Sequence, residues 1–234
     1  MRCSYTKRLV PLGLCLLLAA TSGCAQTQTK PKKKWYDPFG LFAKEEEEGP
    51  KVVTPADWIK RWQALAKEAK KMPPAEQERA STELAWALSK EEDPLLRSYM
   101  LLTLAAFPTK TAETMLSTGL QDGDRNVRVS CCEAWRKRGG EEATRIMCET
   151  LKTDTDLDVR LAAARVLGDL KDTKALPVLG LALDEPFPAL RYRAIESLKK
   201  ISGKEFEDLK SWREYAQGGN PKELSLVSRL RRKF

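Results

Sequence analysis

The sequence predicts an all-α fold, an α-α superhelix (solenoid) of about five helical hairpins. The first observation is an apolar-Arg pair that recurs four times at intervals of 31 or 32 residues. The second is that the apolar residues of each interval follow two helical faces, without the alternation typical of strands. Repetition at this period, with two helices per unit, is typical of an α-solenoid. The four pairs are Leu96-Arg97, Val127-Arg128, Val159-Arg160 and Leu190-Arg191.

The first hairpin is expected in residues 54–92. Thr54 is a good helix cap, and Pro55 suits the first helical position because that position needs no backbone N–H. The helix that they open has a broad apolar face that would close one end of the stack. This face contains Trp58, Trp62, Leu65 and Ala69. The apolar face of the second helix contains Ala80, Leu84 and Leu88.

The next three units repeat the same two faces. Residues three and seven positions after each arginine share one helical face, and residues 15, 19 and 23 positions after it share another. Asp93-Pro94 and Asp124 stand where helices are expected to begin, and Gly139-Gly140 and Asp172 separate paired helices. The first-helix positions are Met100, Leu104, Cys131, Trp135, Ala163 and Leu167, and the second-helix positions are Ala112, Leu116, Leu120, Ala143, Met147, Leu151, Ala175, Leu179 and Leu183.

The last hairpin begins at Leu190-Arg191. Its second helix has Phe206, Leu209 and Trp212 on one side, with Lys210 and Glu214 where the inner repeats are apolar. A polar outer face is what the last unit of a stack needs, because no further unit covers it. The repeat domain is therefore expected to span residues 54–216.

Residues 156–183, which run from Asp156-Leu-Asp-Val-Arg to Leu-Gly-Leu-Ala-Leu, closely resemble the HEAT-like repeat of the bilin-lyase type. The resemblance covers residues 93–203 and the second helix of residues 54–92. It implies a HEAT-like solenoid, a fold that serves scaffolds, adaptors and a few enzymes. Some HEAT-like proteins are di-iron hydroxylases through paired His-Glu motifs, but this chain has no histidine.

Residues 1–23 have the pattern of a signal peptide. Arg2, Lys7 and Arg8 precede the apolar stretch 9–20, which is shorter than the ~20 residues of a membrane span. Thr21-Ser22-Gly23-Cys24 follows and resembles the lipobox of bacterial lipoproteins, in which the signal is cut before the cysteine and the sulfur is lipidated. The resemblance implies that Cys24 attaches an exported protein to a membrane of the bacterial cell envelope. The alternative is a plain signal peptide cut nearby, with Cys24 uninvolved.

Residues 24–53 have the composition of a tether. Lysines at 30 and 32–34 precede the aromatic segment Trp35–Phe42, and Glu45–Glu48 follow it. The lysines suit either attraction to anionic headgroups or a solvated spacer. Because four large rings in eight residues are costly to leave in water, the aromatic segment is expected to dock on the folded body, to lie at the membrane interface or to bind a partner. Docking is the favoured expectation.

The repeated arginines predict a structural ladder. Asp93, Asp124 and Asp156 each precede Arg97, Arg128 and Arg160 by four residues, and Phe187 replaces the aspartate before Arg191. Stacking would bring each arginine near a carboxylate of the neighbouring unit. A row of arginines that binds a ligand is the alternative, but pairs worth ~0–1 kcal/mol each suffice to set the register of the stack.

Composition excludes several kinds of chemistry. With no histidine, the chain lacks Ser-His-Asp and Cys-His nucleophiles and His-ligated zinc. Cys131, Cys132 and Cys148 are expected to be core residues, with a disulfide from Cys148 to Cys131 or Cys132 as the exception. No enzyme activity, metal or other cofactor is predicted.

The net charge of +8 does not predict nucleic-acid binding, because the arginines are spread along the repeat instead of forming one stripe. Residues 217–234 form a basic tail that suits either a short amphipathic helix at a membrane or acidic partner, or a frayed terminus.

The predicted function is a membrane-anchored HEAT-repeat scaffold or adaptor that binds an unidentified protein partner in the cell envelope. The second helices are expected to present the binding surface, at Glu113, Ser117, Glu149 and Lys174. The alternatives are a purely architectural envelope protein and a bilin-lyase-like enzyme or lipid-binding protein with a pocket between helices.

Overall fold

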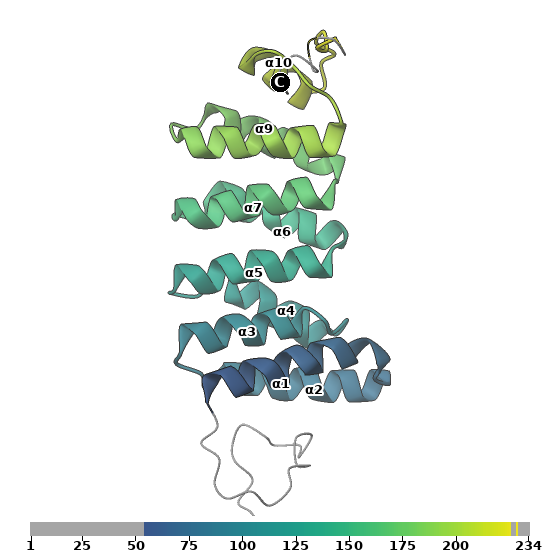
Figure 1. The fold of residues 1–234 in the computed structure, drawn as a ribbon, viewed down its shortest axis with the longest axis vertical. Helices are drawn as coiled ribbons and strands as arrows, with labels where there is room; N and C mark the ends of the chain where they lie inside the picture. Colours follow the sequence, from purple (N-terminus) through teal and green to yellow (C-terminus); the bar gives the residue numbers. More distant parts are fainter. Residues whose placement is uncertain (1–53, 226–227, 229–234) are drawn as a thin grey trace, which may run out of the picture.

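The computed structural model describes residues 54–225 and 228, and all regular elements of this part of the chain are helical (Figure 1). The predicted signal peptide, Cys24, the tether and most of the residues after 225 lie outside it. The α-helices are α1 (Pro55–Glu68), α2 (Pro74–Leu88), α3 (Pro94–Leu104), α4 (Lys110–Gly119), α5 (Arg125–Arg138), α6 (Gly140–Thr153), α7 (Leu157–Leu170), α8 (Leu176–Leu181), α9 (Pro188–Ser202) and α10 (Leu209–Ala216). Three 3-10 turns join them, η1 (Ala69–Lys71), η2 (Thr173–Ala175) and η3 (Ala182–Asp184).

Local sequence explains where these helices begin. The Thr54 side chain accepts a hydrogen bond from the Asp57 backbone N–H, and the Asp57 carboxylate accepts one from the Thr54 N–H at 2.9 Å, which satisfies two donors that the helix itself leaves unpaired. Asp93, Asp124 and Asp156 cap α3, α5 and α7 with their carboxylates, each accepting a hydrogen bond from the backbone N–H two residues later.

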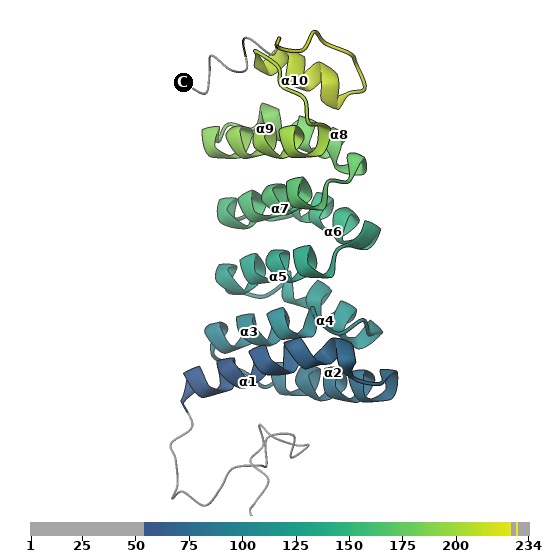
Figure 2. The ribbon, with the colours of Figure 1, turned by 45° about the vertical axis from the view of Figure 1, so that its right-hand side comes forward.

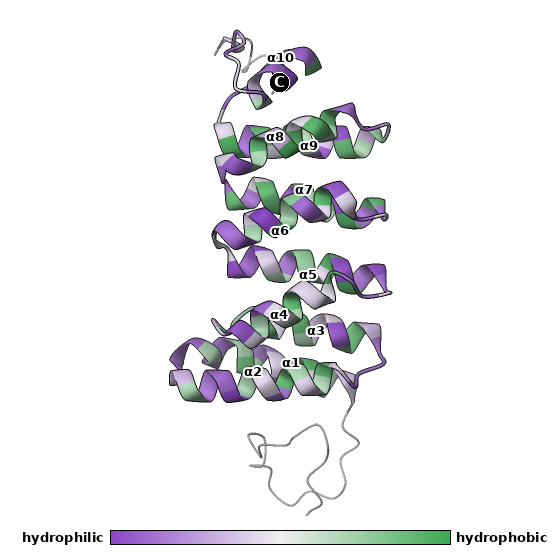
Figure 3. Ribbon diagram, turned by 180° about the vertical axis from the view of Figure 1, so that it is seen from behind, coloured by the Kyte–Doolittle hydropathy of each residue, from purple (hydrophilic) through white to green (hydrophobic). Residues whose placement is uncertain are grey.

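The helices stack in two layers. α1, α3, α5, α7 and α9 pack successively in the first layer, and their paired helices form the second (Figures 1 and 2). The pairs α1–α2, α3–α4, α5–α6, α7–α8 and α9–α10 confirm the predicted all-α solenoid of five hairpins in the described residues. In Figure 3 each helix of the stack carries both hydrophilic and hydrophobic residues, as an amphipathic helix between core and solvent requires.

The core lies between the two layers and follows the predicted faces. Met100, Leu104, Trp135 and Leu167, all predicted first-helix positions, are 0% exposed. The second helices contribute residues such as Leu116, Met147, Leu179 and Leu183, which are equally buried. Because each apolar face is covered by the adjacent units as well as by its own partner helix, the stack is stabilised along its whole length.

Adjacent helices of the stack differ in how closely they approach one another. In the first layer, an added Cβ on Gly168 of α7 would lie 2.8 Å from the Ser197 Cα of α9, and Ser197 Oγ donates to the Ala164 carbonyl at 2.7 Å. In the second layer α4 and α6 barely touch. In the second layer, however, an added Cβ on Gly180 of α8 would lie 2.7 Å from the Ala216 Cβ of α10. The loose contact therefore belongs to α4 and α6, and a hollow opens between them.

Both ends of the array have aromatic clusters. Trp58 and Trp62 of α1 are buried with ring centroids 6.3 Å apart. At the other end the Phe206 and Trp212 rings meet edge to face at 4.7 Å, and both are 2% exposed. Lys210 and Glu214 face solvent on the outer side of α10. Large rings thus close the core where the stack ends, and polar side chains cover it.

Candidate binding surface on the second helices

The four residues predicted for the partner surface lie on three consecutive second helices. Glu113 and Ser117 belong to α4, Glu149 to α6 and Lys174 to η2. Ser117 and Glu149 line one hollow between α4 and α6, and Glu149 and Lys174 line a second one between α6 and α8. Glu113 is not in the lining of these hollows; its carboxylate lies 3.6 Å from the Arg138 guanidinium.

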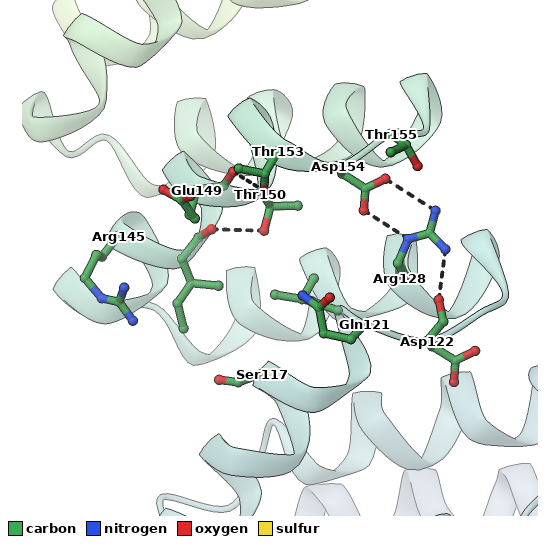
Figure 4. A pocket seen from close by; sticks show the side chains of 12 residues that line it. Ser117, Gln121, Asp122, Arg128, Arg145, Glu149, Thr150, Thr153, Asp154 and Thr155 are labelled. Carbon is green, nitrogen blue, oxygen red and sulfur yellow. Dashed lines mark hydrogen bonds and ion pairs between the residues drawn. The ribbon is translucent and has the colours of Figure 1, made fainter.

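The hollow between α4 and α6, called here the α4–α6 groove, has a volume of about 430 Å³ (Figure 4). Ser117 and Gln121 lie on one side of it, and Arg145, Glu149 and Thr150 lie on the other. Its full lining is Ser117, Leu120, Gln121, Asp122, Arg128, Arg145, Ile146, Glu149, Thr150, Thr153, Asp154 and Thr155. Most of these side chains are polar, so the groove is suited to hydrogen bonding more than to enclosing an apolar molecule.

Helix lengths and one glycine explain why the groove is open. α4 has 10 residues and α6 has 14, so the shorter α4 cannot cover the whole length of α6. Gly119, the last residue of α4, lets that end approach α5, because an added Cβ would lie 2.5 Å from the Cys131 sulfur. α4 therefore packs closely against α3 and α5, and part of α6 is left uncovered.

Most of the hydroxyl groups that line the wall of the α4–α6 groove already donate a hydrogen bond to a backbone carbonyl. Thr150 Oγ1 donates to the Ile146 carbonyl at 2.9 Å, Thr153 Oγ1 to the Glu149 carbonyl at 2.9 Å, and Ser117 Oγ to the Glu113 carbonyl at 3.1 Å. Each oxygen still has lone pairs, so the wall presents acceptors to an incoming donor. A binding partner therefore needs donor groups along this wall.

Arg145 and Glu149 add charges of both signs. Arg145 is held by Glu142 at 2.9 and 2.7 Å, and this hydrogen bond raises the pKa of the exposed Arg145 guanidinium and lowers that of the Glu142 carboxyl. The Glu149 side chain is 61% exposed and lies 3.7 Å from Lys152. Exposed groups of this kind select a complementary partner more than they add affinity.

The floor at one end of the groove is an ion-pair ladder. Arg128 Nε donates to Asp154 Oδ2 at 2.9 Å, and its Nη1 donates to the Asp122 carbonyl at 2.9 Å. The arginine–carboxylate contact recurs in the neighbouring units. Arg97 Nε donates to Asp122 Oδ2 at 2.8 Å in the preceding unit, and Arg160 donates to the Glu185 carboxylate in the following one. Arg191 donates to the backbone carbonyls of Glu185 and Pro186 at 2.7 and 3.2 Å.

The ladder holds its groups in their charged forms. Hydrogen bonding to their carboxylate partners raises the pKa of Arg97 and of Arg128. Burial raises the pKa of Asp122, but the hydrogen bonds from Arg97 and from the Asp124 backbone N–H oppose it and leave the pKa below its usual value. These charges therefore hold adjacent units together and are not poised for proton transfer.

Two stretches of the chain, residues 81–163 and 144–214, match the family model of HEAT repeats, and together they span more than half of the sequence. The chain belongs to the HEAT-repeat family. Among curated proteins none matches the sequence significantly. Among solved structures, one similar chain comes from the complex of CpcE and CpcF of phycocyanin lyase from Nostoc sp. PCC7120. It is 17% identical with a TM-score of 0.44, over 69% of this chain and 70% of that one.

The acidic partners of the ladder follow a pattern of their own in this HEAT array. Glu91, Asp122, Asp154 and Glu185 each stand six residues before the arginine of their unit, and Arg97, Arg128 and Arg160 contact the carboxylates of the last three. Asp93, Asp124 and Asp156, predicted from the sequence as members of the ladder, accept the capping hydrogen bonds of their own helices. Asp124 and Asp156 also attract Arg97 and Arg128 of the preceding units electrostatically. The acid at minus six, which all four units have, is the signal that would have identified the partners.

The cysteines of the HEAT array are free thiols in the described residues. Burial raises the pKa of Cys131 well above its usual value and that of Cys132 to about 12. Cys148 is half-buried, lines the hollow between α6 and α8, and has a pKa raised by burial. Since a thiolate is the reactive form, none of the three is activated as a nucleophile. No cluster of three potential metal ligands occurs in the described part of the chain.

Proposed function

We propose that this HEAT array is a non-catalytic scaffold that a lipid on Cys24 attaches to a membrane of the bacterial cell envelope, where the second-helix layer binds a protein partner. The α4–α6 groove carries the binding part of the proposal. It is open and lined by acceptor hydroxyls and by charges of both signs, and it continues through Glu149 into the hollow that Lys174 lines. Such a surface fits the side chains of another protein, since it is extended and its polar groups are dispersed.

The sequence supports the membrane attachment. Cys24 follows a positively charged segment, an apolar stretch and three small residues, the order that a lipoprotein signal requires. None of the helices in residues 54–225 is long and apolar enough to cross a membrane. Acyl chains on one cysteine would supply the attachment, since each buried methylene contributes about 0.8 kcal/mol.

The ionisable groups support a non-catalytic role. The shifted groups of the ladder, Arg97, Arg128 and Asp122, are paired in their charged forms, and the raised thiol pKa values disfavour thiolates. A general acid or base needs a pKa shifted toward the working pH instead. The charged groups of the ladder therefore stabilise the stack of hairpins, and the surface of the second helices is available for binding.

Crosslinking in native membranes tests the proposal. A photo-crosslinking amino acid in place of Ser117 is expected to capture one protein, identified by mass spectrometry. The double reversal Glu149→Lys with Lys174→Glu should abolish this product without changing helicity, because it inverts the charges along the surface. The matched control reverses Glu207 and Lys210, which are exposed near the end of the array. Capture that survives the first reversal, or is lost equally in the control, would contradict the proposal.

A further inference from the structure

A third hollow, larger than the other two, lies where α1, α3 and the end of α5 meet, and it shares no residue with the α4–α6 groove. Its volume is about 950 Å³. Tyr99, Leu102 and Ala106 of the α3 region are half-buried in its lining, and Ala66 of α1 lies opposite them. We call this hollow the α1–α3 groove.

The apolar floor of the groove is peculiar to α3. Leu102 and Ala106 stand five and nine residues after Arg97. At plus five in the next two units, Glu133 of α5 and Arg165 of α7 form a 3.0 Å ion pair that bridges their helices.

The plus-nine position behaves in the same way. Asp169 of α7 and Lys200 of α9 pair at 2.7 Å, so the first-helix layer is crossed by charged bridges from α5 onwards. At these two positions the α3 unit has Leu102 and Ala106, which carry no charge and cannot form such a bridge to α1. The gap between α1 and α3 is therefore left as a hollow with an apolar floor.

Lysines surround this floor. Lys67 and Lys70 line it from the α1 side and Lys137 from α5, and all three are exposed. They have no carboxylate partner among residues 54–225, whereas Lys71, next to Lys70, pairs with Glu68 at 3.1 Å. Arg138 also lines the groove, but its guanidinium donates to the Phe107 and Thr109 carbonyls at 2.7 and 3.2 Å. Three positive charges thus remain available beside apolar surface.

We propose that residues 35–48 of the same chain bind in the α1–α3 groove. This segment combines two chemistries that complement the groove, the aromatic side chains of Trp35–Phe42 for its apolar floor and the four carboxylates of Glu45–Glu48 for its lysines. The rings cover Leu102 and Tyr99, and the carboxylates meet the three lysines. Burying the rings removes apolar surface from water, and the opposite charges fix the direction in which the segment lies.

The length of the connection permits this binding. Lys67 lies about 20 Å along α1 from Thr54, at ~1.5 Å per residue. An extended chain spans about 3.3 Å per residue, so Glu48 reaches ~20 Å from Thr54, Glu45 about 30 Å and Phe42 about 40 Å. A segment tied so close has an effective concentration in the millimolar range, which favours it over free competitors for the same groove.

Intramolecular crosslinking tests this inference independently of the proposed partner. p-Benzoylphenylalanine replaces Tyr99 in the full-length, membrane-attached protein, and illumination is followed by peptide mapping. The expected product joins position 99 to a peptide within residues 35–48. Tyr192, an exposed tyrosine of α9 in the same helix layer, is the matched control position and should give no such product. A product with lipid, a second copy or another protein in place of the segment would overturn the inference.

Charge exchange provides the second arm. Lys67→Glu, Lys70→Glu and Lys137→Glu together should lower the crosslink yield roughly tenfold, the change that about 1.4 kcal/mol of lost attraction produces. Adding lysines at 45–48 to this variant should restore the yield, which a merely misfolded array could not do. Hydrogen exchange is followed in parallel, and the triple variant should expose peptides of residues 35–48 and 99–106. The inference would be rejected if the triple variant left hydrogen exchange and crosslink yield unchanged. It would also be rejected if the added lysines at 45–48 did not restore the crosslink yield.

Discussion

Arg128 of α5 and Asp154, which follows α6, join two consecutive units through paired hydrogen bonds of 2.9 Å (Nε to Oδ2) and 3.3 Å (Nη2 to Oδ1). Their side chains are only 14% and 9% exposed. A pair shielded to this degree is worth more than a surface salt bridge, and it fixes the distance between adjacent hairpins.

Asp154→Ala is expected to lower the free energy of unfolding by about 2–3 kcal/mol, because it leaves the Arg128 guanidinium poorly paired and removes the acceptor of the Asp156 backbone N–H. Urea denaturation followed by circular dichroism measures the loss. Asp158→Ala is the control, since Asp158 and Arg125 form a 3.0 Å pair that is more than half exposed, and it should cost less than ~1 kcal/mol. Equal losses of unfolding free energy in the two variants would show that the ladder pair contributes no more than an exposed ion pair.

The Asp122 carboxyl predicts how stability depends on pH. Its folded-state pKa is lowered from 3.8, so the stabilisation by its ionised form is fully present above that value and is lost as the pH falls through the folded-state pKa. Asp122→Asn should therefore be less stable than the parent at neutral pH, and the difference should shrink in acid. Denaturation at a series of pH values measures it. A difference that is constant with pH would mean that the charge of Asp122 contributes nothing.

Gly168→Ala tests the close approach of α7 and α9. The added Cβ would lie 2.8 Å from the Ser197 Cα, a backbone atom that cannot move without shifting α9. The clash should cost about 1–3 kcal/mol, although alanine alone favours a helix over glycine by ~1 kcal/mol. Gly123→Ala is the matched control, because nothing lies within 4 Å of its added Cβ. A stabilised Gly168→Ala protein would show that the first-helix layer is looser than described.

The sequence predicted the helical faces well, because burial at fixed spacing is a local property that each unit repeats. It predicted the positions of the arginines but not their partners. From its position four residues before Arg128, Asp124 is expected to pair with the arginine of the adjacent unit. Its carboxylate instead accepts hydrogen bonds from the Asn126 and Val127 backbone N–H groups. The carboxylate that remains for the ladder is Asp122, two residues earlier in the loop.

Neither groove was predictable from the helix pattern alone. The α4–α6 groove depends on the shortness of α4 and on its contact with α5 at Gly119, and both follow from how the units stack. The second helix of the fourth unit is also broken. Residues 173–184 form η2, α8 and η3 in place of one helix, and Pro177 near the start of α8 has no N–H to donate.

Leu167→Ala tests the assignment of the core. Leu167 of α7 is 0% exposed, so truncation should cost about 2–5 kcal/mol through lost burial and the cavity it leaves. Leu181→Ala is the control, since Leu181 of α8 is 64% exposed and its loss should stay within ~0.5 kcal/mol. Denaturation midpoints compare the two directly. A near-neutral Leu167→Ala would mean that the register of the repeats differs from the one described.

Cys24→Ser tests the membrane attachment. If the sulfur of Cys24 carries the lipid, serine removes this covalent attachment, and the protein should move from the membrane fraction to the soluble one. Two acyl chains are needed for stable attachment, so a partial loss of acylation should already weaken it. Cys3→Ser is the control, because Cys3 lies in the segment that the signal pattern predicts to be removed. Immunoblots of fractionated cells measure the distribution. A Cys24→Ser protein that stays with the membrane would show that the attachment is made elsewhere, and the lysine-rich and aromatic residues of the tether would become the next residues to change.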